Sequence, residues 1–176
     1  SGQARLFESV LQQRVAATPS AALDAVSLSP VIKKARAAGI AVFTADSDSA
    51  DSERQVYVAQ SMDKDLGYTL IDRLALQCGE KGQIGIISGE STATNLNSWI
   101  SFMKERLADK YPGMALVDVR FTSGGSSEDA LRQAKELMTS FPNLKGLVAV
   151  ASTTVPGAVH AVQQADLAGE VAVIGY

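Results

Sequence analysis

Residues 83–99, QIGIISGESTATNLNSW, form the stretch that decides the fold. A short apolar run rich in β-branched residues comes first and predicts a buried strand. Small and hydroxylated residues then form a polar turn. Beyond the turn, Trp99, Met103 and Leu107 recur at intervals of four, which predicts a helix with these side chains on one face. A strand, a turn and a helix in this order make half of a βαβ unit.

The turn of this unit is the expected place for a ligand, because open α/β sheets bind ligands outside the carboxyl ends of their strands. Its polar side chains are hydroxyls and amides, namely Ser88, Ser91, Thr92, Thr94, Asn95 and Asn97. Such groups donate and accept hydrogen bonds, but they are weak nucleophiles without an adjacent base. The turn therefore favours binding over catalysis.

The rest of the chain alternates between helical and extended patterns. Helices are expected over residues 3–14, 25–38, 63–78 and 156–165, over the segment that carries Trp99, and after the turn 123–127. Strands are expected over residues 40–44, 54–60, 115–121, 146–150 and 171–174 and at the start of 83–99, and a short extended run is expected over residues 15–18. About six strands alternating with about six helices predict an α/β fold, in which parallel sheets are flanked by helices on both faces.

The first two helices carry specific expectations. Their inward-facing side chains are expected to be Leu6, Val10, Val26, Ile32 and Ala35. Pro30 suits the first turn of a helix, so the second helix has two alternative starts, at Ala25 or after Ser29 acting as N-cap. Gly39 stands where glycine commonly ends a helix.

Composition argues against several classes of function. The chain has 176 residues, of which 46% are apolar and 20% charged, as in a globular protein that buries a core. A net charge of −3, without a block of Lys and Arg, argues against nucleic acid as a partner. Apolar runs stay below about 18 residues, so no membrane span is expected. The sequence lacks the phosphate-binding patterns Gly-x-Gly-x-x-Gly and Gly-Lys-Ser/Thr, and no cofactor is expected.

Several single residues could take part in catalysis or binding, but each has a structural interpretation. Cys78 and His160 are the single cysteine and histidine, too few for a structural zinc site, and no metal is expected. Cys78 is interpreted as a half-buried residue at a helix end. Trp99 is interpreted as a core or inter-lobe packing residue, with exposed stacking as the alternative. Gly124 and Gly125 are interpreted as a plain loop, with anion binding at the following helix N-terminus as the alternative.

An acidic loop, residues 45–53, directly follows the strand 40–44. Its spacing does not fit a calcium-binding EF-hand, because counting from Asp46 puts Asp51 and Tyr57 where Gly and Glu are required. A solvated loop is the default interpretation. Asp46, at the carboxyl end of the strand, is well placed to accept hydrogen bonds from ligand hydroxyls.

Four stretches resemble the periplasmic sugar-binding proteins of ABC transporters, of the ribose-binding type, and among them the subgroup that binds rhamnose or the autoinducer sugar. They are residues 29–40 (SPVIKKARAAGI), 44–48 (TADSD), 94–99 (TNLNSW) and 153–158 (TTVPGA). The second is similar to the family's Thr-Trp-Asp-Ser-Asp, with Ala45 replacing the aromatic residue. The third is similar to an amide-rich turn followed by Trp. The resemblance implies a type I periplasmic-binding-protein-like fold of two α/β lobes, and a periplasmic location.

Carried over residue by residue, the resemblance implies a ligand site made of Asp46, Asn95, Asn97, Ser152 and Thr153. Asp46 would accept hydrogen bonds from vicinal sugar hydroxyls, and charge-assisted bonds are roughly twice as strong as neutral ones. Asn95 and Asn97 would read hydroxyls from the other lobe, and Ser152 and Thr153 match positions at the pocket mouth. The autoinducer binders carry a carboxylate and an amide at the positions of Asn95 and Leu96, so this chain favours rhamnose or another monosaccharide.

The sequence departs from the family at both ends. No strand and helix with pocket aromatics precede Gln3, the start lacks an initiator Met or leader, and the family continues beyond Tyr176. The chain is therefore expected to be a piece, an incomplete two-lobe protein. Residues 1–58 would be part of the first lobe and residues 59–176 most of the second. Whether this piece forms a complete cleft alone, or forms a homodimer, stays open.

The function that the resemblance implies is that of a solute-binding component of a carbohydrate ABC transporter, not an enzyme. The lobes would close around a monosaccharide and then dock on a membrane permease. An alternative is the effector domain of a sugar-responsive repressor, which would carry a helix-turn-helix upstream. An enzyme using Asp46 or Asp48 as base is a third class, but no His, Lys or Cys partner stands at a strand end. The fold alone does not choose among these classes.

Overall fold

The computed structural model describes residues 2–176, and the chain divides into two compact units. Among the described residues, the first unit contains residues 2–62 together with Thr92–Asn95. The second contains Asp63–Ser91 and Leu96–Tyr176. Each unit has its own parallel sheet.

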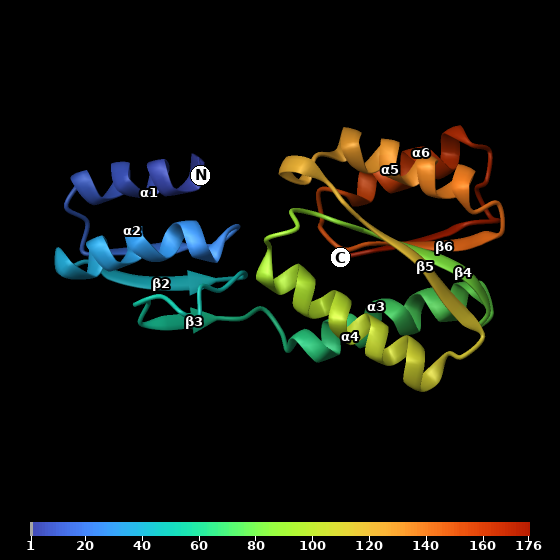
Figure 1. Ribbon diagram of the computed structural model, residues 1–176, viewed down its shortest axis with the longest axis horizontal. Coiled ribbons are helices and arrows are strands. Elements are labelled where there is room, and N and C mark those ends of the chain that lie inside the picture. The colour runs from blue at the N-terminus through green and yellow to red at the C-terminus, as the bar shows by residue number, and fades with distance from the viewer. Residues whose placement is uncertain (1) are drawn as a thin grey trace. The chain divides into compact units, whose positions relative to one another are not determined.

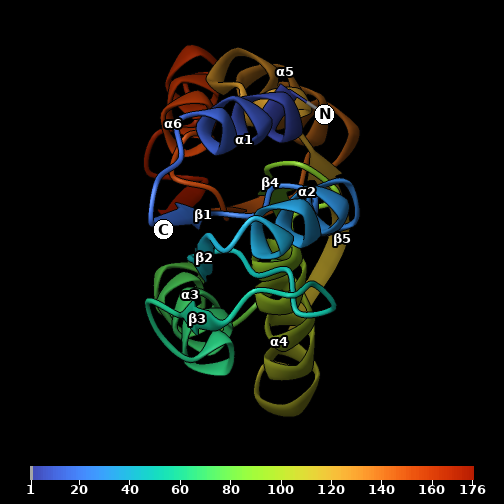
Figure 2. The same cartoon turned by 90° about the vertical axis from the view of Figure 1, so that its left-hand side faces the viewer.

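The first unit is built from two helices, α1 (Gly2–Gln12) and α2 (Ala25–Ala37), and three strands. The strands are β1 (Ala17–Ser20), β2 (Ala41–Ala45) and β3 (Val56–Val58), which pair in parallel in the order β1-β2-β3. Figure 2 shows α2 lying along one side of these strands. The core between helices and sheet is apolar, with Phe7, Leu28, Ile32 and Val42 among its buried members.

The structure shows which of the two expected starts of α2, at Ala25 or after Ser29, is correct. Asp24 is the N-cap, and its carboxylate accepts hydrogen bonds from the backbone N–H groups of Val26 (3.1 Å) and Ser27 (3.3 Å). The start after Ser29 is therefore wrong, and Pro30 lies inside the helix. At the other end, Gly39 follows the C-cap with φ 79°, as expected for glycine after a helix.

Two of the expected inward-facing side chains point outward. Val26 is 84% exposed, because six positions turn a helix by about 600°, which separates Val26 from the buried Ile32. Leu6 is 71% exposed, and its neighbour Phe7 occupies the core in its place. A single turn of apolar residues thus did not reveal which of two adjacent side chains is buried.

The two faces of the first sheet differ in their environment. Thr18, Val42 and Thr44 share one face and are buried, with Val42 in the core that the helices form. The register places a second set on the opposite face, which we call the outer apolar face: Ala17, Pro19, Ala41, Phe43, Ala45, Val56 and Val58. Val56 and Val58 are each 53% exposed. Neither face of a parallel sheet is usually left open in this way.

The second unit is a larger α/β layer structure. Its helices are α3 (Asp63–Cys78), α4 (Thr94–Lys110, of which the first two residues are counted with the first unit), α5 (Ser127–Ser140) and α6 (Val155–Gln164). Its strands are β4 (Gly82–Ser88), β5 (Met114–Phe121), β6 (Leu144–Ala149) and β7 (Ala172–Gly175), and a 3-10 turn spans Ser123–Gly125. The strands pair in parallel in the order β5-β4-β6-β7.

Helices cover both faces of the second sheet. Figure 1 shows α5 and α6 on one side and α3 and α4 on the other. Trp99, Met103 and Leu107 are all buried along α4, as their spacing predicted. The predicted fold class, an α/β arrangement of parallel sheets flanked by helices, is confirmed, although the first sheet keeps its outer apolar face.

Candidate ligand-binding site at the strand ends

Asp46 stands at the carboxyl end of β2 and presents an exposed carboxylate. Its backbone has φ 66°, the left-handed conformation that only a few non-glycine residues adopt. Two contacts with β3 hold this backbone: the N–H of Asp46 donates to the Val58 carbonyl (3.1 Å), and the Tyr57 hydroxyl donates to the Asp46 carbonyl (2.9 Å). The side chain is thereby directed by a fixed backbone at the edge where ligands bind.

Asp48, two residues further on, uses its carboxylate inside the protein. Oδ1 accepts hydrogen bonds from Arg54 Nε (2.8 Å), the Thr44 hydroxyl (2.5 Å) and the Ser49 N–H (2.8 Å), and Oδ2 accepts one from Arg54 Nη2 (2.7 Å). The Arg54 fork, with these other donors, holds the pKa of Asp48 below its usual range. The Asp48 carboxylate is therefore hydrogen-bonded within its own loop, whereas Asp46 is exposed.

Asn95 joins Asp46 in the first unit. Its Nδ2 donates to Asp46 Oδ1 across 3.3 Å, and the Asn95 side chain is largely buried at 7% exposure. The preceding Thr94 Oγ1 donates to the Asp48 carbonyl (3.1 Å) and lies 3.2 Å from Ser47 Oγ. The structure therefore brings together two of the predicted site residues, a carboxylate and an amide.

Asn97, Ser152 and Thr153 belong to the second unit. Asn97 lies exposed in the first turn of α4, where its Nδ2 donates to the Ser91 carbonyl (2.8 Å). Ser152 and Thr153 are exposed in the loop between β6 and α6. Within residues 2–176, no hydrogen bond links Asn97 to either of them. All three residues follow the carboxyl ends of strands in one sheet.

The loops at this edge of the second sheet lie close together. A Cβ atom on Gly125 would come within 3.1 Å of Thr153 Oγ1, and one on Gly89 within 3.3 Å of Ala151 Cβ. Thr154, by contrast, is buried and donates its hydroxyl to the Ala151 carbonyl (2.7 Å). The structure therefore leaves Ser152 and Thr153 as the outward-facing hydroxyls of their loop.

The anion-binding alternative at Gly124 and Gly125 is answered by the protein's own carboxylates. The Gly124 N–H donates to Glu90 Oε1, and the Ser123 N–H donates to Asp129 Oδ2 (3.0 Å). Ser126 caps α5 by accepting a hydrogen bond from the Asp129 N–H. Because acidic side chains already occupy these donors, the loop interpretation holds for this turn.

Tyr176 is a candidate that the sequence reasoning missed. It directly follows β7, is 46% exposed, and its ring centroid lies 4.9 Å from that of Trp99 at an interplanar angle of 56°. Trp99 itself is 1% exposed, which confirms its interpretation as a core residue. The signal available in the sequence was an aromatic residue directly after a predicted strand, the position where ligands are contacted in open sheets.

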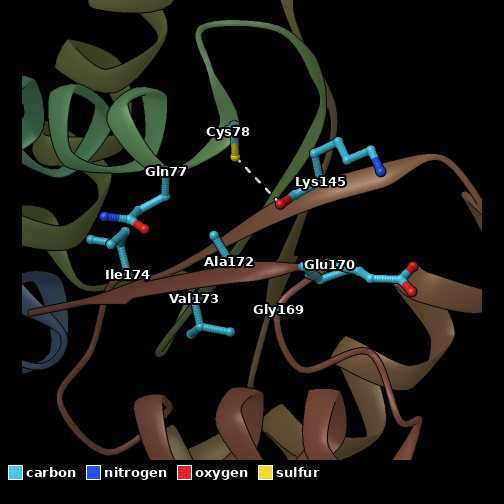
Figure 3. Close-up of a pocket in the computed structure, with 9 residues that line it drawn as sticks. Gln77, Cys78, Lys145, Gly169, Glu170, Ala172, Val173 and Ile174 are labelled. Carbon is cyan, nitrogen blue, oxygen red and sulfur yellow. Dashed lines mark hydrogen bonds between the residues drawn. The ribbon is translucent and has the colours of Figure 1, made fainter.

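A pocket of about 380 Å³ lies at the opposite end of the second sheet. Figure 3 shows Cys78, Lys145 and Glu170 around it, with the Cys78 thiol donating to the Lys145 carbonyl (3.3 Å). Burial raises the pKa of the Cys78 thiol, which disfavours the reactive thiolate. Cys78 is half-buried at the end of α3, as predicted. The pocket lies near the amino ends of β6 and β7, whereas Ser152 and Thr153 follow the carboxyl end of β6.

Metal binding and membrane insertion both bear on the class of site. Across residues 2–176, no group of three or more His, Cys, Asp or Glu side chains is arranged to hold a metal ion. Over the same residues, none of the helices combines the length and hydrophobicity of a membrane span.

Polar side chains at the strand ends of α/β units are typical of proteins that hold a ligand outside a parallel sheet. The chain belongs to the family described as periplasmic binding protein domain, whose model matches residues 1–176. The family membership expected from the four sequence stretches is therefore confirmed.

Individual relatives agree with this assignment. The D-ribose/D-allose-binding protein of Pseudomonas aeruginosa is 32% identical over 100% of this chain and 56% of its own length. An ABC transporter solute-binding protein from Clostridium phytofermentas, solved with bound L-rhamnose, is 28% identical with a TM-score of 0.94, over 98% of this chain and 54% of that one. A solute-binding protein from Burkholderia graminis, in complex with D-arabinose, is 27% identical with a TM-score of 0.89, over 98% and 60%. The chain thus spans somewhat more than half the length of these relatives.

Proposed function

We propose that this chain is part of the solute-binding component of a carbohydrate ABC transporter. It would bind a monosaccharide by hydrogen bonds from Asp46, Asn95, Asn97, Ser152 and Thr153. The observation that carries the proposal is the Asp46–Asn95 pair, an exposed carboxylate with an amide 3.3 Å away at the carboxyl end of a parallel strand. A carboxylate accepts hydrogen bonds only, so Asp46 suits the vicinal hydroxyls of a sugar.

L-rhamnose is the first ligand to test. It is the sugar bound by the Clostridium phytofermentas protein, and ribose, allose and arabinose follow from the other two relatives. Monosaccharides differ from one another in the orientation of their hydroxyls. A site that hydrogen-bonds each hydroxyl rejects the wrong isomer, because the buried polar groups of the site then lose their partners.

The wider context forms part of the same proposal. The protein would act in the periplasm, and the sugar-bound form would dock on a membrane permease. Self-association of the 176-residue chain is a separate expectation, supported by the outer apolar face with its exposed Val56 and Val58.

Titration calorimetry tests the function directly, on the longest natural protein that contains this chain. We expect saturable binding of one monosaccharide with a Kd in the micromolar range or below. Replacing Asp46 by Ala should weaken binding about 10- to 100-fold, since it removes charge-assisted hydrogen bonds. Asp51→Ala is the matched control, because Asp51 is an exposed acidic residue of the same loop. Absence of binding across the sugar panel, or equal losses for Asp46→Ala and Asp51→Ala, would reject the proposal.

A further inference from the structure

We propose that Asp48 and Arg54 are positioning residues for ligand binding, and that their ion pair holds Asp46 in the conformation that presents its carboxylate. The inference rests on the proposed function for its effect on affinity. It concerns residues that the resemblance did not assign to the site. All of its contacts lie within the first unit.

The Asp48 carboxylate connects two distant points of the loop between β2 and β3. Thr44, near the end of β2, donates its hydroxyl at 2.5 Å, and Arg54, shortly before β3, donates two parallel hydrogen bonds at 2.8 and 2.7 Å. The side chains of Asp48 and Arg54 are only 17% and 24% exposed, and Thr44 is fully buried. A bidentate pair with this much shielding fixes geometry better than an exposed ion pair does.

Asp46 lies between Thr44 and Asp48, the two residues that the hydrogen bond from the Thr44 hydroxyl to the Asp48 carboxylate joins. Its left-handed backbone, at φ 66°, costs on the order of 1 kcal/mol for a residue other than glycine, so surrounding contacts must hold it. The Asp46 backbone is hydrogen-bonded to Tyr57 and Val58 of β3, and Arg54 lies just before that strand. The ion pair therefore ties the residue before β3 to the loop that follows β2, and the parallel register of β3 on β2, with Val58 beside Ala45, keeps the Asp46 backbone in place.

The pair also controls charge beside the ligand. Asp46 and Asp48 are carboxylates two residues apart, and Arg54 neutralises the second of them. Without Arg54, the negative charge of Asp48 would lack its partner in a partly buried position, which favours rearrangement of the loop. Loss of Arg54 should therefore disturb Asp46 by both geometry and charge.

Sugar affinity gives the first test, as a double-mutant cycle in the longest natural protein that contains this chain. Arg54→Gln should raise the Kd about five- to tenfold, whereas in an Asp46→Ala background it should change the Kd by less than about twofold. This loss of effect is the expected result, because a residue that acts through Asp46 cannot act when Asp46 is gone. Additive losses, or an unchanged Kd for Arg54→Gln in a protein that binds sugar, would overturn the inference.

Hydrogen exchange gives a second test that needs no ligand. The Asp46 amide is bonded to the Val58 carbonyl, so Arg54→Gln should speed exchange in a peptide covering residues 44–48. Lys34→Gln is the matched control, because it removes an exposed ion pair of the same unit, Lys34–Glu8 at 2.8 Å, away from the loop. Unchanged exchange in Arg54→Gln would overturn the inference even if the protein bound no sugar, and failure of the sugar proposal alone would leave this result intact.

A conservative variant covers the case in which Arg54→Gln does not fold. Arg54→Lys keeps the charge but loses the planar fork that makes two parallel bonds. We expect it to fold, with a Kd and an exchange rate between those of the wild type and of Arg54→Gln. Wild-type values for both measurements in Arg54→Lys would show that charge alone suffices and would overturn the positioning role.

Discussion

The indole Nε1 of Trp99 donates a 2.8 Å hydrogen bond to Oδ1 of Asp63. Asp63 is the first residue of α3, and Trp99 lies on the buried face of α4, so the bond ties the start of one helix to the interior of the next. Trp99 also packs against Tyr176 after β7. One side chain therefore connects three separate segments of the second unit.

Removing the acceptor of this bond should destabilise the second unit. In Asp63→Ala the buried indole N–H loses its partner, and we expect the free energy of unfolding to fall by about 1–2 kcal/mol. Urea denaturation followed by the emission of Trp99, the single tryptophan, measures this directly. Asp65→Ala is the control, since Asp65 is an exposed acid in the same first turn, and its effect should stay within about 0.5 kcal/mol. Equal effects of the two substitutions would contradict the role of the bond.

Replacing either of two helical glycines by Ala should lower the stability of the protein, whereas the same replacement in an ordinary helix raises it. Ala normally stabilises a helix by about 1 kcal/mol relative to Gly. At Gly67, however, a Cβ would come within 2.7 Å of both Phe102 Cβ and the Trp99 carbonyl oxygen, and at Gly157 it would collide with the Ser127 carbonyl. We expect a loss of about 1–3 kcal/mol at each position, measured by thermal unfolding. Gly2→Ala, with nothing within 4 Å, is the control and should change stability little. A stabilised Gly67→Ala would show that α3 and α4 pack less closely than described.

Much of the fold could be predicted because most helices and strands are indicated by the local spacing of their apolar residues. The helix 63–78 and the buried face of Trp99, Met103 and Leu107 agree with their apolar spacing. The start of α2 could not be decided, because the choice between Asp24 and Ser29 depends on which side chain reaches the free N–H groups. Leu6 and Val26 were misplaced for a related reason: burial depends on where the sheet lies, which is not a local property.

The candidate site was predictable to a lesser extent. Asp46 could be predicted as a ligand-binding candidate because it directly follows a strand, and its carboxylate is exposed beside Asn95 in the structure. The ion pair of Asp48 with Arg54 could not be predicted, because two residues six positions apart in an irregular loop follow no periodic pattern. Tyr176 was missed because its contact with Trp99 joins residues far apart in the sequence.

The Asp48–Arg54 pair should contribute to the acid sensitivity of the fold. The pKa of Asp48 is lowered, chiefly by its hydrogen bonds from Arg54, so its contribution to stability is present above the pKa of an unfolded Asp, about 4. That contribution is lost as the pH falls through the lower folded pKa. Arg54→Gln removes the main cause of the shift, so its free energy of unfolding should depend less on pH below about 4 than that of the wild type. Urea denaturation across this range measures the difference, and parallel curves for the two proteins would contradict the prediction.

The outer apolar face should make the 176-residue chain self-associate. Val56 and Val58 point outward from β3 at 53% exposure each, beside Phe43 of β2 in the same register. Val56→Thr with Val58→Thr keeps the β-branched shape and removes apolar surface, so sedimentation equilibrium should show about tenfold weaker association than in the wild type. Leu76→Thr is the control, because Leu76 is 67% exposed on α3 of the second unit and should leave association unchanged. A wild-type chain that stays monomeric at high concentration, or an equal effect of Leu76→Thr, would show that this face is not what drives association.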